Sequence, residues 1–119
     1  MANTFKVITR DVMSASANTD ETLYTTQSGS TVVIIGFTMA NVHTAQVTAT
    51  VSLASTTTQT SQTTNTTAKI VQAIPIPVGS SVEIMAGNKI ILNAGDIIKV
   101  QCSVADKISV IMSYMEITA

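Results

Sequence analysis

Residues 107–117 carry the clearest alternation of hydrophobic and polar positions in the chain. One parity is hydrophobic along most of its length and includes Ile108, Val110, Met112 and Tyr114. The other parity mixes Lys and Ser with the apolar side chains Ile111, Met115 and Ile117. Because successive side chains point to opposite faces of a strand, this pattern predicts a β-strand with one apolar face and a second apolar patch on its other face.

Most of the remaining chain shows strand-like patterns of the same kind. Residues 31–40 contain an apolar run rich in β-branched side chains, which predicts a central strand covered on both faces. Gly36 in this run indicates a β-bulge or a close backbone approach. Residues 44–54 alternate, and the side chains expected to point inward are Val47, Ala49, Val51 and Leu53. Shorter strands are predicted at residues 5–9, 22–26, 68–74, 82–85, 89–92 and 97–104.

Residues 55–67 consist entirely of Thr, Ser, Gln and Asn. A segment without large apolar side chains cannot join a core, so it predicts a solvated loop or a long hairpin tip. The candidate exposed residues of this loop are Thr57, Gln59, Thr60, Gln62 and Asn65. Pro75 and Pro77 follow it and have no backbone N–H to donate. They predict an extended edge, or a crossover that passes from one sheet to another.

About eight or nine strands with turn signals between them, and no sustained helical period, predict an all-β protein. We expect a single antiparallel β-sandwich of about eight strands, either jelly-roll or immunoglobulin-like. A length of 119 residues fits one such domain. We divide it into an N-terminal arm with the first strand, residues 1–20, and a β-sandwich domain, residues 21–119.

The composition is unusual for an isolated monomer. Charged residues make up 11% of the chain and hydrophobic residues 45%, whereas a typical soluble domain is about 25% charged. This balance favours a surface that is covered by neighbouring subunits, or a polar coat with little charge. The net charge is −1 and the basic residues are scattered, so nucleic-acid binding, which needs clustered Lys and Arg, is disfavoured.

Reactive side chains are few and isolated. His43 and Cys102 are each the only residue of their type, and the parity of Cys102 predicts a buried structural thiol. Asp20 and Glu21 could bind a cation with turn carbonyls, but solvated turn charges are the favoured interpretation. No carboxylate pair or Gly-x-Ser-x-Gly elbow stands out. We therefore expect a protein that is not an enzyme, with no catalytic residue, cofactor or metal site.

Two further features concern location. The N-terminal residues lack the continuous apolar segment of a secretory signal. No apolar run approaches the ~20 residues of a membrane helix. We therefore expect no membrane association and synthesis in a reducing cytoplasm.

From Leu23 to Thr118, an ordered series of local patterns is similar to small bacteriophage virion proteins. Leu23-Tyr24-Thr25-Thr26 precedes the apolar run, and the Thr-rich segment follows. Residues 75–81 then read Pro-x-Pro-x-Gly-Ser-Ser, and residues 92–100 read Leu-x-Ala-Gly-Asp-x-Ile-Lys-Val. A closing Ser-Tyr-Met-Glu strand completes the series. These patterns resemble those of phage head or tail accessory subunits.

The resemblance implies a structural component of the virion, assembled in the host cytoplasm, with the major capsid protein or other virion subunits as partners. The leading hypothesis is a capsid cement or decoration protein that stabilises the head. The alternatives are a tail, neck or baseplate accessory subunit associated with fibres, or a host-glycan-binding module. The low charge and the apolar patch predict a homo-oligomer, with a trimer favoured over a dimer. The candidate interface residues are Phe5, Ile111, Met115 and Ile117.

Overall fold

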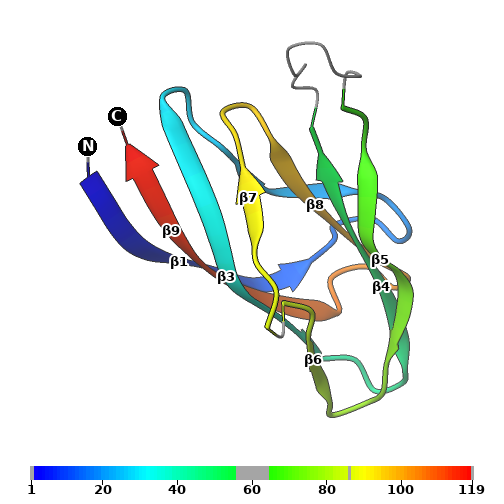
Figure 1. The fold of residues 1–119 in the computed structure, drawn as a ribbon. Helices are drawn as coiled ribbons and strands as arrows, with labels where there is room; N and C mark the ends of the chain where they lie inside the picture. The colour runs from blue at the N-terminus through cyan, green and yellow to red at the C-terminus, as the bar shows by residue number, and fades with distance from the viewer. Residues whose placement is uncertain (1, 56–64, 86, 119) are drawn as a thin grey trace.

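The computed structural model describes residues 2–55, 65–85 and 87–118, and all its regular elements are strands (Figure 1). The strands are β1 (Ala2–Met13), β2 (Glu21–Thr25), β3 (Ser30–Asn41), β4 (Val47–Ala54), β5 (Ala68–Ile76), β6 (Ser81–Glu83), β7 (Ile90–Leu92), β8 (Ile97–Cys102) and β9 (Ile108–Thr118). They form two antiparallel sheets. The prediction of an all-β antiparallel sandwich is confirmed. Among the described residues, no helix has the length and apolar character needed to cross a membrane.

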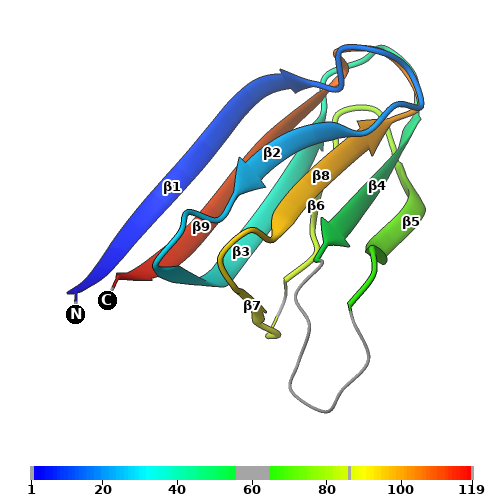
Figure 2. The same cartoon turned by 90° about the horizontal axis from the view of Figure 1, so that it is seen from above.

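The connectivity of the sheets is that of a jelly roll. One sheet has the order β1-β9-β3, and both β6 and β7 pair with the outer side of β3; the other has the order β2-β8-β4-β5. The first half of the chain therefore pairs with the second half in reverse order, from β1 with β9 inward to β4 with β5. This nested pairing, visible in Figure 2, decides between the two predicted sandwich types in favour of the jelly roll.

The core lies between the sheets and is built from one parity of each long strand. In β9 the inward side chains of Ile108, Val110 and Met112 are fully buried and Tyr114 is nearly so, as the alternation predicts. The strands of the facing sheet contribute Val47, Val51, Ile98, Val100 and Cys102. Burying each such aliphatic side chain stabilises the fold by about 1.5–3 kcal/mol, so this shared interior holds the two sheets together.

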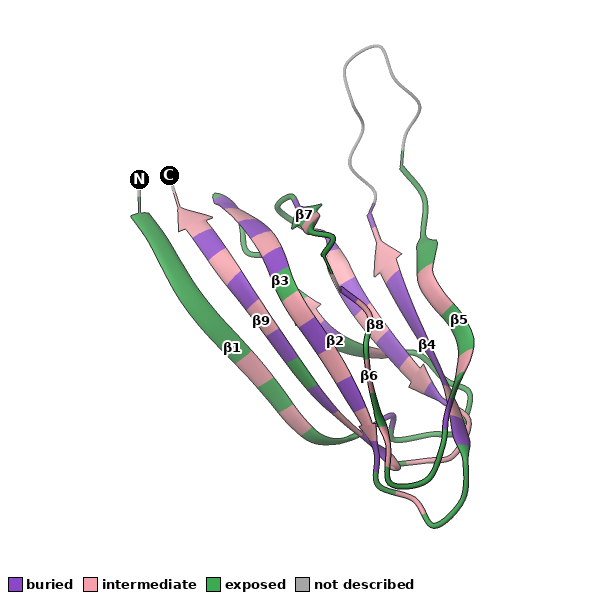
Figure 3. Cartoon of the chain, turned by 60° about the horizontal axis from the view of Figure 1, so that its bottom comes forward, coloured by how far each residue is buried: buried purple, intermediate pink, exposed green. Residues whose placement is uncertain are grey.

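β1 is longer than the predicted strand at residues 5–9. It pairs with β9 from Ala2, opposite Thr118, to Met13, opposite Ile108. Residues 2–7 are exposed on both faces because β1 is a sheet edge at this end (Figure 3). Backbone pairing with β9 therefore holds most of this strand, and the sequence signals it only by the short alternation of Phe5 and Val7.

β3 is central in its sheet, as predicted, but its outer face is not covered. Its register with β9 shifts between Ile34 and Gly36, which confirms the bulge predicted at Gly36. Ile35, the extra residue of the bulge, is 40% exposed. The prediction that this strand is covered on both faces is wrong, because one face of the apolar run packs in the core and the other face is partly exposed.

The proline-containing segment behaves as the sequence predicts. Pro75 lies in β5, at the edge of the four-stranded sheet, and β6 already belongs to the other sheet. The intervening residues, which include Pro77, therefore make the crossover. The short strands β6 and β7 do not pair with each other. They pair with different parts of β3, at residues 38–40 and 32–34.

Candidate interaction surface

The outer face of the five-stranded sheet carries a continuous apolar row. Phe5 of β1 lies opposite Met115 of β9, Met115 opposite Val33 of β3, and Val33 opposite Ile91 of β7. Phe5 is 75% exposed and Ile91 60%, while Met115 and Val33 between them are half-buried. Directly opposed side chains on one sheet face lie within contact distance, so these residues form one stripe across the full width of the sheet.

The predicted interface residues all belong to this face. Ile117 lies between Asn3 and Thr31, one row from the stripe, and Ile111 lies between Thr9 and Thr38 on the other side of it. Ile111 is 48% exposed. The register thus brings Phe5, Met115, Ile111 and Ile117 together. We call the apolar outer face the surface formed by Phe5, Val7, Val33, Ile91, Ile111, Met115 and Ile117.

Sequence reasoning missed three members of this surface, Val7, Val33 and Ile91. Val33 lies in a run that predicts a strand covered on both faces, and Ile91 lies in a segment too short to show its parity. The period-2 pattern around Val7 carried a usable signal, because Phe5 and Val7 share the parity opposite to Lys6.

The outer face of the four-stranded sheet has a different character. Its central strands β4 and β8 place Thr50 opposite Gln101 and Ser52 opposite Lys99. Lys69 of the edge strand β5 lies opposite Ser52. Thr50 and Ser52 are themselves buried, so Lys69, Lys99 and Gln101 form the accessible part of this face. The two outer surfaces of one small domain are therefore unequal: one presents polar and charged side chains, and the other carries the apolar stripe.

Charged side chains on the inner face of β1 tie this edge strand to the rest of the domain. The Lys6 ammonium donates to Glu116 Oε1 at 2.7 Å, and Glu116 is almost fully buried. The hydrogen bond to Glu116 raises the pKa of Lys6 above its ordinary value. Arg10 pairs with Glu21 of β2, in the facing sheet. Inward charges on an edge strand oppose pairing with a foreign strand, so the backbone edge of β1 is protected while its outer face is open.

A tyrosine pair lies next to this ion pair. The ring centroids of Tyr24 and Tyr114 are 5.0 Å apart, which is a favourable separation for aromatic rings. Burial, with the nearby Tyr114 and Glu116, raises the pKa of Tyr24 to about 12. The phenol therefore stays neutral at physiological pH and acts as a packing group.

The carboxylate of Glu83, at the end of β6, accepts three hydrogen bonds. Its Oε1 accepts from the backbone N–H of Phe37 at 2.9 Å and of Met85 at 2.8 Å, and its Oε2 accepts from the Thr38 hydroxyl at 2.8 Å. Burial alone would raise the pKa of Glu83, but these three hydrogen bonds outweigh it and hold the pKa below its ordinary value. The carboxylate thus replaces strand pairing beside the bulge of β3.

The residues considered for chemistry occupy structural positions. Cys102 is a free, fully buried thiol, as predicted. Asp96 accepts from the backbone N–H of Asn93 at 2.9 Å within the β7–β8 turn. The backbone N–H of His43 donates to Asn41 at 2.7 Å at the bend after β3. In residues 2–55, 65–85 and 87–118, no group of three or more His, Cys, Asp or Glu side chains could hold a metal, and no pocket is found.

The acidic pair Asp20 and Glu21 is engaged within the domain. Glu21 accepts from Arg10 and from the backbone N–H of Ala15, and Asp20 accepts from the Gln101 amide at 3.4 Å.

Of the predicted loop residues, Asn65 is exposed and donates to the Ser55 hydroxyl at 3.1 Å. Thr57, Gln59, Thr60 and Gln62 lie outside the described residues.

Comparisons with known proteins do not assign the chain to a family. No family model matches the chain, and no curated protein does. A solved chain from "Bacillus endospore appendages form a novel family of disulfide-linked pili" matches with 13% identity and a TM-score of 0.49. The match covers 98% of this chain and 87% of that one. At this identity and score, the comparison assigns no function.

Proposed function

We propose that this protein is a non-enzymatic structural subunit of a bacteriophage particle, a decoration protein that binds the capsid and stabilises the head. The location follows from the resemblance of the turn-and-strand patterns between Leu23 and Thr118 to phage accessory subunits. The major capsid protein is the partner that this location supplies.

The observation that carries a structural role is the inequality of the two outer sheet faces. A monomer in water is expected to solvate both faces. This chain places Lys69, Lys99 and Gln101 on the outer face of the four-stranded sheet, whereas large apolar side chains are exposed on the other outer face. Large exposed apolar surfaces on soluble proteins mark contacts with other macromolecules. In the particle, the apolar outer face is covered by neighbouring subunits.

A rigid jelly roll suits this role. Its two sheets share one buried core. The ion pairs Lys6–Glu116 and Arg10–Glu21 attach the exposed edge strand β1 to the rest of the domain. A subunit that binds only the assembled shell stabilises it by mass action. Many identical copies of a weakly charged domain can also be packed on one particle without strong mutual repulsion.

Antibody labelling tests the location. Gold-labelled antibody against the purified protein, viewed by negative-stain microscopy, is expected to decorate the heads of intact phage particles. Label on tails or baseplates instead would support the accessory-subunit alternative, and the absence of label from all particles would contradict a virion role.

An add-back experiment tests the stabilising function. Particles prepared without this protein are expected to release DNA at a lower temperature, and added wild-type protein should restore the wild-type release temperature. A matched control is the variant Met112→Asp, which places a charge in the core and should not fold. Equal release temperatures with and without the wild-type protein would contradict a cement function.

A further inference from the structure

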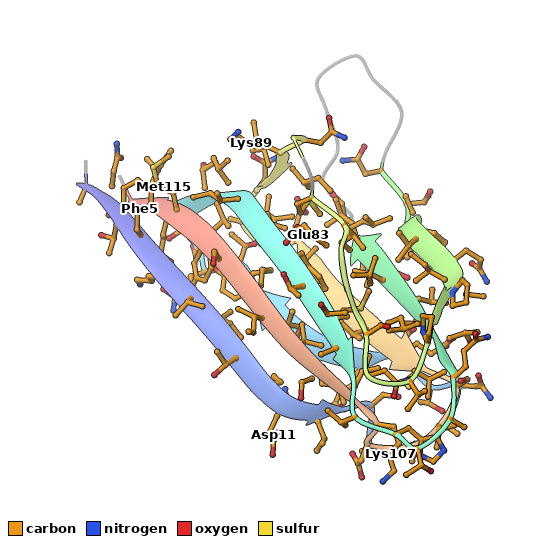
Figure 4. All side chains as sticks on the ribbon, turned by 90° about the horizontal axis from the view of Figure 1, so that it is seen from below. Phe5, Asp11, Glu83, Lys89, Lys107 and Met115 are labelled. Carbon is orange, nitrogen blue, oxygen red and sulfur yellow. The ribbon has the colours of Figure 1, made fainter. Side chains whose placement is uncertain are left out.

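On the outer face of the five-stranded sheet, the apolar stripe lies near one end and the charged side chains lie at the margins. Among its strand residues, the outward charges are Asp11, near the end of β1, and Glu83, at the end of β6. Lys89 and Lys107 lie just outside the strands. Figure 4 shows Phe5 and Met115 side by side at one end of the sheet, with Asp11 and Lys107 at the other. Acidic and basic groups therefore both lie at the margins of this face.

The exposed apolar area matches the requirement of a homodimer. Phe5, Val7, Ile91 and Ile111 are 75%, 59%, 60% and 48% exposed. If each is given a full surface of about 150 Å², the low end of the aromatic range, they expose roughly 360 Å². A standard interface buries about 800 Å² on each partner, and about two-thirds of that is apolar in homodimers. The half-buried Val33, Met115 and Ile117 supply much of the remaining apolar area.

We propose that the apolar outer face binds the same face of a second copy, with a two-fold axis that runs along the strands between β9 and β3. A face that meets itself must do so about a two-fold axis. This axis places Phe5 against Ile91 of the other copy, and Met115 against its Val33. The two sheets pack about 10 Å apart at about 30°, as aligned sheets do.

Charge and strand order favour a second copy as the occupant. The chain has a net charge of −1, so two copies repel each other weakly. Phe5 and Ile91 occupy opposite edges of the sheet, so the axis pairs the two most exposed large residues of the row. This two-fold dimer is an alternative to the trimer favoured from the sequence.

Sedimentation of the purified protein measures the association. Between about 1 and 200 µM, the wild type should pass from a 12.4 kDa monomer to a species of twice that mass. Phe5→Lys and Ile91→Glu should each raise the dissociation constant at least about tenfold. The matched control is Val78→Lys, which alters a side chain that is 56% exposed in the β5–β6 turn, and it should leave the dissociation constant unchanged.

A mixture of the two charged variants tests the proposed axis. In a mixed dimer, one contact places the new ammonium against the new carboxylate, and the other keeps Phe5 against Ile91. Mixing Phe5→Lys with Ile91→Glu should therefore restore the dimer that each variant alone has lost. If Phe5→Lys fails to fold, the milder Phe5→Ser takes its place in the single-variant comparison. The dissociation constants of Phe5→Ser and Ile91→Glu are then each compared with that of the wild type.

Three results would overturn the proposal. They are a wild-type monomer at every concentration, a dimer that withstands Phe5→Lys and Ile91→Glu as well as it withstands Val78→Lys, and a mixture that stays monomeric. The experiment uses purified protein, so its failure leaves the virion role intact. A failure of particle labelling would likewise leave the dimer intact.

Discussion

The carboxylate of Glu83 offers a direct test of how the split strand pair β6–β7 is held. Glu83→Ala removes the acceptor for the backbone N–H groups of Phe37 and Met85 and for the Thr38 hydroxyl. A hydrogen bond to a charged group contributes about 1.5–3 kcal/mol. Glu83 is exposed, so water replaces part of what is lost. We expect the free energy of unfolding to fall by about 2–3 kcal/mol at pH 7.

The pH dependence of this loss identifies its cause. The folded pKa of Glu83 lies below the ordinary value of 4.5. Its contribution is therefore present above the unfolded pKa and disappears as the pH falls through the lower, folded value. In urea unfolding, the difference between the wild type and Glu83→Ala should shrink as the pH is lowered below about 4.

Thr38→Val provides the matched control, because it removes only the hydroxyl contact and should lower stability by about 0.5–1 kcal/mol. A Glu83→Ala variant within about 0.5 kcal/mol of the wild type at pH 7 would refute the reasoning. So would a difference that is equally large at pH 3 and pH 7.

Three other outcomes follow from the structure. Cys102→Ser should lower the unfolding free energy by about 1–3 kcal/mol, because a hydroxyl replaces a fully buried thiol, and native Cys102 should resist a thiol reagent that labels it in urea. Gly36→Ala should change stability by less than about 1 kcal/mol, since the new Cβ meets Glu83 Oε2 at 3.8 Å, whereas Gly95→Ala, at a φ of +90°, should lose about 1–2 kcal/mol in the same unfolding assay. Lys6→Met should lower the unfolding midpoint at neutral pH. This difference should vanish as the pH rises through the raised pKa of Lys6. Because the pKa of Lys6 is higher in the folded than in the unfolded protein, its stabilising contribution is complete below the unfolded pKa and is lost as the pH passes the folded pKa.

The sequence predicts the strands with strong alternation well, and it is less reliable where strands are short or at an edge. The inward parity of β9 and the bulge at Gly36 could be predicted because burial on one face imposes a period of two. The extent of β1 could not, because residues 2–7 are held by backbone pairing with β9 and face solvent on both sides. These residues show only the short alternation of Phe5 and Val7, which is too brief to give the bounds of the strand.

The apolar outer face shows the same limit from another direction. Phe5, Met115, Ile111 and Ile117 were found separately, from exposed apolar positions on two strands. Val33 and Ile91 join them only through the strand register. The register places residues 5, 115, 33 and 91 in one row, although they belong to segments far apart in the chain. No local pattern contains that information.

The nested order of the strands also determines when the fold can be completed. β4 and β5 are the innermost pair and can form as a hairpin, whereas β1 must wait for β9, which lies at the other end of the chain. Pairing Ala2 with Thr118 closes the largest loop in the molecule, and such non-local contacts make folding slow. On the ribosome, the row of Phe5, Met115, Val33 and Ile91 cannot exist until β9 has emerged. The apolar outer face is thus completed last, together with the five-stranded sheet, in which β9 lies between β1 and β3.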